Sequence, residues 1–190
     1  MALLGVLALA ACTRGDAEGG VTAPPSPPAT SETLTAEPTS EPTETGEAVA
    51  PPEMPAEARE RTAEGAELFA TYLFAVTDYA YNSGDIGPLL AIAHDECTSC
   101  QSIASEIEAS VADGAWFEGV ATEVTSAAAP PPDDLGTVVS VAIDEAASRQ
   151  VASDGSTIDE TPGAMGIGAD VYLVKTRDGW QVFGIGRAER

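Results

Sequence analysis

The chain has 190 residues, and its 31 acidic side chains against 8 Lys and Arg give it a formal net charge of −23. Affinity for nucleic acid comes from Lys and Arg that neutralise phosphates, so this charge excludes a nucleic-acid partner. Strong acidity is instead typical of a soluble surface that resists association.

The first segment, MALLGVLALAAC, is a run of small or apolar residues that ends at Cys12. It is too short to span a bilayer as a helix, which takes about 20 apolar residues, and it has the length of the apolar core of a secretory signal. Leu9-Ala10-Ala11-Cys12 resembles the bacterial lipobox, which implies cleavage before Cys12 and lipidation of its sulfur. Residues 1–11 lack the Lys or Arg with which such signals begin, and this leaves the translation start open.

A long spacer is expected to follow the signal peptide, over residues 12–55 and including the lipidated Cys12. Most of the chain's 14 prolines lie there, together with Thr, Ser and Glu, and aromatic residues are absent. Such a segment buries too little apolar surface to offset the entropy of ordering it, so we predict a disordered tether. Lipid on Cys12 would hold the protein to the extracytoplasmic face of the cell membrane, and residues 56–190 would form one folded domain.

Three helices are predicted at the start of this domain. In residues 57–82, apolar side chains recur at steps of three and four, as on one face of a helix. Asp85 can cap a short second helix that ends near Ile92. A third helix is predicted over about residues 98–112, with Thr98 or Ser99 as its N-cap. Its apolar stripe consists of Ile103, Ile107 and Val111.

After residue 115 the apolar period changes to two, which is typical of half-buried strands. Four to six antiparallel strands are predicted, over residues 116–127, over 137–144, in a hairpin over 149–158 and in a final hairpin formed by 169–177 and 180–186. The two hairpins turn at Asp154-Gly155 and Asp178-Gly179. The glycine-rich residues 163–168 are interpreted as a loop or bulge between strands.

Helices that precede antiparallel strands predict an α+β fold, with three N-terminal helices packed on a curved antiparallel sheet. The long first helix, the stretch YNSGDIGPLLAIA and the terminal hairpin resemble the cone-shaped domains of the nuclear transport factor 2-like superfamily. A closer resemblance lies in EGAELFATYLFAVTDYAYNSGD, DECTSCQSI and DGAWFEG, which are similar to actinobacterial lipoproteins that carry the domain of unknown function 6318. This resemblance implies location and fold but no activity.

The cone resemblance implies a pocket between helices and sheet, and Tyr72, Asp78 and Tyr79 are its predicted lining. We predict a module that binds a small apolar ligand or a cell-envelope protein. The alternative is a small isomerase- or dehydratase-like enzyme, whose general acid or base would come from those three residues or from Tyr81, His94 or Asp170. The sequence has neither a phosphate-binding loop nor a Gly-x-Ser-x-Gly elbow, and it predicts no cofactor, no metal and no assigned catalytic residue.

HDECTSC, residues 94–100, brings together the only histidine and two of the three cysteines. Lipidation of Cys12 would leave an even pair, and export would place Cys97 and Cys100 where disulfides persist. The first turn of a helix also brings residues three apart close to the separation that a disulfide prefers. We therefore predict a Cys97–Cys100 disulfide. The alternatives are a zinc site that includes His94 and Asp95 or Glu96, and a redox-active pair.

Overall fold

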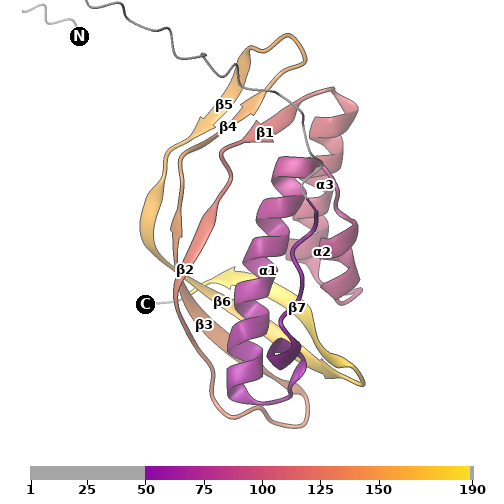
Figure 1. Ribbon diagram of the computed structural model, residues 1–190, viewed down its shortest axis with the longest axis vertical. Helices are drawn as coiled ribbons and strands as arrows, with labels where there is room; N and C mark the ends of the chain where they lie inside the picture. Colours follow the sequence, from indigo (N-terminus) through magenta and orange to yellow (C-terminus); the bar gives the residue numbers. More distant parts are fainter. Residues whose placement is uncertain (1–49, 189–190) are drawn as a thin grey trace, which may run out of the picture. The chain divides into compact units, whose positions relative to one another are not determined.

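A computed structural model describes residues 50–188 (Figure 1). The predicted signal peptide, Cys12 and most of the predicted tether lie outside the described residues. A short 3-10 helix comes first and three α-helices follow: η1 (Ala56–Arg59), α1 (Ala63–Ser83), α2 (Gly87–Ile92) and α3 (Thr98–Ala112). The strands are β1 (Trp116–Glu118), β2 (Thr122–Ala128), β3 (Gly136–Glu145), β4 (Ser148–Val151), β5 (Thr157–Thr161), β6 (Ala164–Thr176) and β7 (Gly179–Arg187).

The first predicted helix is confirmed, but it begins at Ala63 and not at residue 57. Thr62 is its N-cap, and the Thr62 hydroxyl accepts a hydrogen bond from the Gly65 amide at 3.1 Å. A side chain on Gly65 would not fit, because its Cβ would lie 2.1 Å from the Glu60 carbonyl oxygen. The helix ends at Gly84, whose φ of 75° is the left-handed conformation that glycine adopts without strain.

The strands of the described residues form two antiparallel sheets, with strand orders β1-β4-β5 and β2-β3-β6-β7. The predicted cone, with three helices on one curved sheet, is therefore wrong. Figure 1 shows the smaller sheet in the upper part of the domain, the larger sheet in the lower part, and the helices to one side. α1 contacts β1, β2 and β3, and α3 contacts β1 and β7, so both helices pack against both sheets.

Three neighbouring interruptions separate the two sheets: residues 119–121, 146–147 and 162–163, which we call the junction. Gly119 has a φ of 79°, outside the extended region, and Pro162 has no amide to donate to a ladder. At Gly163 a Cβ would lie 2.9 Å from the Glu145 carbonyl oxygen, so the backbones approach closely there. These residues end the hydrogen-bonded pairing of neighbouring strands at the junction. The predicted strand over 116–127 is accordingly broken into β1 and β2.

Both predicted hairpins are confirmed, as β4 with β5 and as β6 with β7. Residues 163–168 are not a loop, because β6 already begins at Ala164. The alternative of a bulge holds: the β3–β6 register shifts beside Gly166, which has a φ of 64°. The Gly166 amide donates to the Asp144 carboxylate at 2.7 Å.

The core lies between the helices and the four-stranded sheet. Its largest fully buried side chains include Phe69, Leu73, Val76, Leu89, Ile107, Val139, Val171 and Val182. Of the stripe predicted on α3, Ile107 is fully buried but Val111 is 52% exposed. Residues upstream of η1 also contact the domain, because Met54 packs against the core and the Tyr72 hydroxyl donates to the Pro52 carbonyl at 3.3 Å. Within residues 50–188, no helix combines the length and apolar character needed to cross a membrane.

Candidate functional site

A cleft of about 350 Å³ lies where α1 and α3 face the junction between the two sheets. Its walls come from both helices, from the junction and from strands of both sheets, so segments far apart in the sequence build it. Aromatic and aliphatic side chains form much of the wall: Phe74, Tyr81, Ile103, Phe117, Val120 and Ile185. A concave, largely apolar site with a few polar groups is the usual form of a small-molecule site.

Asp78 lies in the cleft wall, and it ties α1 to the start of β2. One carboxylate oxygen accepts from the Thr122 amide at 2.7 Å, and the other accepts from the Thr122 hydroxyl at 2.8 Å. One helical turn further on, the Asn82 side chain donates to the Val120 carbonyl at 2.6 Å. Burial raises the pKa of Asp78, and the two hydrogen bonds from Thr122 oppose that shift. Asp78 and Asn82 thus satisfy backbone groups that the interrupted strand leaves unpaired.

Tyr81 lies one turn beyond Asp78 and connects α1 to α3 across the cleft wall. Its hydroxyl donates to the Glu106 carboxylate at 2.9 Å, and its ring makes an edge-on contact with Phe117 at a centroid distance of 5.0 Å. Burial raises the pKa of Tyr81 strongly, and the hydrogen bond to Glu106 and the charge of that residue add to the rise. Tyr81 therefore stays neutral and donates a hydrogen bond.

The charged groups of the cleft are mostly carboxylates: Asp78, Glu106, Glu145 and Asp159. Arg149 is the cleft's cationic side chain, and its guanidinium is paired with Glu118 at 2.8 and 2.5 Å. The Trp116 indole also donates to Glu118, at 2.9 Å, and these hydrogen bonds from Trp116 and Arg149 lower the pKa of Glu118. The positive charge of Arg149 is therefore already balanced.

The structure does not bring the three predicted pocket residues together. Asp78 lies in the cleft wall, but Tyr72 and Tyr79 are not among the residues that line it. Tyr72 contacts Pro52, and the Tyr79 hydroxyl donates to Asp85 at 3.2 Å. Positions 72 and 79 are seven residues apart and share one stripe of α1, while position 78 faces another side. Phe74, Asp78 and Tyr81 have the spacing of one helical face, and this signal would have identified the cleft stripe.

His94 and Asp170, which were also considered as acid–base groups, lie away from the cleft. The His94 ring packs against Phe183 at a centroid distance of 5.5 Å, and its Nδ1 accepts from the Glu96 amide at 3.2 Å. Asp170 accepts from the Ser140 hydroxyl at 2.8 Å. Sequence analysis did not single out Glu106 or Glu145, because no local pattern brings these segments together.

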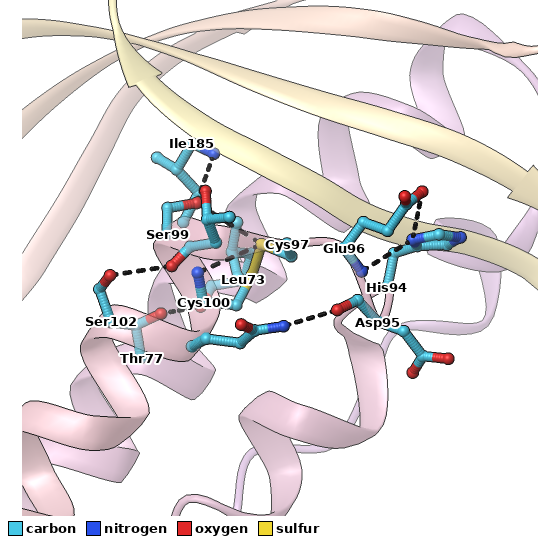
Figure 2. Close-up of a disulfide and its surroundings, with 12 residues drawn as sticks. Leu73, Thr77, His94, Asp95, Glu96, Cys97, Ser99, Cys100, Ser102 and Ile185 are labelled. Atoms are coloured by element: carbon cyan, nitrogen blue, oxygen red, sulfur yellow. Dashed lines mark hydrogen bonds and ion pairs between the residues drawn. A yellow bond between two sulfur atoms is a disulfide. The ribbon is translucent and has the colours of Figure 1, made fainter.

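The predicted Cys97–Cys100 disulfide is present, with a Cα–Cα distance of 5.3 Å (Figure 2). Both residues are fully buried in the core. The N-cap of α3 is Cys97 rather than the predicted Thr98 or Ser99, and its sulfur accepts from the Cys100 amide at 3.2 Å. Because metal binding requires thiolates, sulfurs joined to each other do not serve as zinc ligands. Burial also denies them the access that thiol–disulfide exchange requires.

The disulfide lies where the α2–α3 connection enters α3, and residues on both sides of it bind the outer edge of β7. The His94 amide donates to the Val182 carbonyl at 2.8 Å, and the Ser99 hydroxyl accepts from the Ile185 amide at 2.9 Å, as Figure 2 shows. Covering an edge strand satisfies backbone groups that would otherwise be open to pairing with another chain. The Cys97–Cys100 disulfide, which we call the staple, therefore lies in the segment that covers this edge.

Comparison with known proteins gives one family match. Residues 38–184 match the family described as "Family of unknown function (DUF6318)", and no curated protein matches the chain. Among solved structures, the chain is similar to the intermembrane space region of the chloroplast protein ARC6, with 12% identity, a TM-score of 0.43, and coverage of 66% of this chain and 97% of that one. It is also similar to the protein Aln2 from a Streptomyces species, with 15% identity, a TM-score of 0.40, and coverage of 65% and 90%.

Proposed function

The chain belongs to the DUF6318 family of unknown function, and we propose that it is an extracytoplasmic lipoprotein whose folded domain binds a small ligand with an apolar body. Lipid on Cys12 anchors it to the membrane. The cleft between α1, α3 and the junction is the binding site. The observation that carries this proposal is the cleft wall, in which aromatic rings and carboxylates from distant segments converge on one concavity.

Two independent features support an extracytoplasmic localisation. The sequence Leu9-Ala10-Ala11-Cys12 resembles a lipobox, and the domain holds a disulfide between Cys97 and Cys100. Structural disulfides form and persist outside the reducing cytosol. Lipidation of Cys12 and the Cys97–Cys100 disulfide together would account for all three cysteines of the chain.

A binding role fits the cleft better than an isomerase- or dehydratase-like enzyme built on the predicted acid–base residues, because the two that line the cleft, Asp78 and Tyr81, are both engaged by other protein groups. General acid–base catalysis needs a titratable group directed at the substrate. Asp78 is the half-buried acid of the cleft, but both of its carboxylate oxygens accept hydrogen bonds from Thr122. That arrangement fits a carboxylate that holds α1 to β2.

Membrane fractionation tests the anchor. We expect the wild-type protein in the membrane fraction, with diacylglycerol on Cys12 detected by mass spectrometry, and we expect Cys12→Ala to appear in the soluble extracytoplasmic fraction. Cys12→Ala protein that stays in the membrane fraction would contradict the proposed anchor.

Ligand binding is tested by NMR on the full chain carrying Cys12→Ala, with a set of small aromatic fragments. Phe117 lines the cleft, so Phe117→Ala should weaken binding of the fragments that shift cleft resonances. Phe183 is the matched control, since it is an exposed aromatic residue of β7 that does not line the cleft. Equal losses in Phe117→Ala and Phe183→Ala would locate binding elsewhere and refute the proposed site.

A further inference from the structure

We infer that the ligand of the cleft is an organic cation, such as an amine whose ammonium group is joined to an apolar body. This inference rests on the proposed function, which places a small ligand in the cleft. The cleft's acids come from four different elements: Asp78 from α1, Glu106 from α3, Glu145 from β3 and Asp159 from β5. The fold, and not one acidic run of sequence, therefore gathers them around one apolar concavity.

The four carboxylates differ in how many hydrogen bonds they make within the protein. Asp78 is bound through both oxygens to Thr122, and Glu106 accepts from Tyr81 through one oxygen. In the part of the chain that the structure describes, no protein hydrogen bond or ion pair engages the Glu145 or Asp159 side chain. Acceptors therefore remain available on Glu106, Glu145 and Asp159, which come from three different elements. An ammonium group supplies donors without competing acceptors.

The local charge favours a cation over an anion or a neutral ligand. Arg149 is balanced by Glu118, so the carboxylates leave the cleft negative at neutral pH. An anionic ligand would meet like charges, which costs free energy at short range. The aromatic residues Tyr81 and Phe117 add to the preference, because a cation is attracted to the face of an aromatic ring.

The spacing of the acids points to an organic cation and not to a metal ion. Among residues 50–188, no three His, Cys, Asp or Glu side chains converge closely enough to coordinate one metal. Calcium, for example, takes six to eight oxygen ligands at about 2.3–2.6 Å. Carboxylates spread around an apolar wall suit a ligand whose apolar body fills the cleft and whose charged group meets one or two acids at its rim.

Three probes of nearly equal shape test the inference: 2-phenylethylamine, 2-phenylethanol and 3-phenylpropanoate, each titrated at neutral pH into the full chain carrying Cys12→Ala and followed by NMR. We expect the amine to bind more tightly than the alcohol, the carboxylate to bind least, and the amine's affinity to fall as salt is added. Glu106→Gln keeps an acceptor for Tyr81 but removes one charge, so it should weaken amine binding about three- to fivefold and leave alcohol binding unchanged.

Glu108→Gln is the matched control, because Glu108 lies on the same helix but does not line the cleft. If Glu108→Gln weakens amine binding as much as Glu106→Gln, the attraction belongs to the acidic surface as a whole and the inference fails. If amine and alcohol bind equally at the cleft, the preference for a cation is refuted while the proposed binding site stands. If no probe shifts cleft resonances and the aromatic fragments also fail to do so, both the site and the inference are refuted.

Discussion

Replacing the two cysteines of the staple by alanine, in Cys97→Ala/Cys100→Ala, should destabilise the domain by about 3 kcal/mol. The disulfide joins residues with a sequence separation of 3, and closing so short a loop in the unfolded chain corresponds to about 2 kcal/mol in the chain-entropy description. Both side chains are fully buried, so removing their sulfurs also loses core packing, which adds about 1 kcal/mol. Since small domains are stable by about 5–15 kcal/mol, the variant should still fold.

The loss should concentrate at the edge of β7. Urea denaturation gives the change in unfolding free energy, and hydrogen exchange gives the protection of the Ile185 amide, which donates to Ser99. We expect that protection to fall in the double variant by more than the global loss of stability accounts for. Ser99→Ala is the control, because it removes the hydrogen bond with the disulfide intact and should cost about 1 kcal/mol.

Two results would refute this reasoning. A double variant that loses less than about 0.5 kcal/mol would show that the buried staple adds no more than an average surface contact. Unchanged protection of Ile185 would show that β7 keeps its edge covered without the covalent link.

Raising the pH above about 10 should destabilise the domain more in the wild type than in Tyr81→Phe. The pKa of Tyr81 is raised in the folded state, so the unfolded chain loses this proton at a lower pH. The unfolded state therefore gains stability relative to the folded state as the pH rises. Urea midpoints of the wild type and Tyr81→Phe that change in parallel from about pH 9 to 11 would contradict this. Gly65→Ala should lower the unfolding free energy by about 2–3 kcal/mol, because its Cβ would meet the Glu60 carbonyl oxygen at 2.1 Å. Gly155→Ala is its control, with a φ of 82° but nothing within 4 Å, and it should cost only about 1 kcal/mol.

The helices and hairpins were largely predictable because their signals are local. Apolar spacing identified α3 over residues 98–112, and it placed the end of the first helix at residue 82, one residue before the observed end at Ser83. The turn at Asp154-Gly155 was equally predictable, because an Asp side chain can accept a hydrogen bond from the amide two residues further on. The Asp154 carboxylate does so, from the Ser156 amide at 2.9 Å. The start of α1 was less clear, because residues 57–61 are Glu, Ala and Arg, which favour a helix, and the break depends on the extended Glu60.

The division into two sheets was not predictable in the same way. When they are read alone, Gly119 and Ala146 are each compatible with a continuous strand, a bulge or a turn, and Pro162 is compatible with an edge strand, a bulge or a turn. They end the strand pairing only because the fold places the three interruptions side by side in the junction. There the Ala146 amide donates to the Ala121 carbonyl at 2.9 Å. A period-two pattern predicts strands, but it does not say where neighbouring strands stop pairing.

The same junction gives Asp78 a structural role that sequence analysis did not predict. Sequence analysis named Asp78 as a possible pocket residue and as one candidate acid or base among several. Interrupted strands leave amide groups that need partners, and Asp78 meets that need by accepting both hydrogen bonds of Thr122. Asp78, half-buried and with its oxygens satisfied, ties α1 to β2, whereas Glu145 is exposed at the cleft, makes no hydrogen bond to another described side chain and is available to the proposed ligand. The search for ligand contacts in this cleft should therefore begin at its rim.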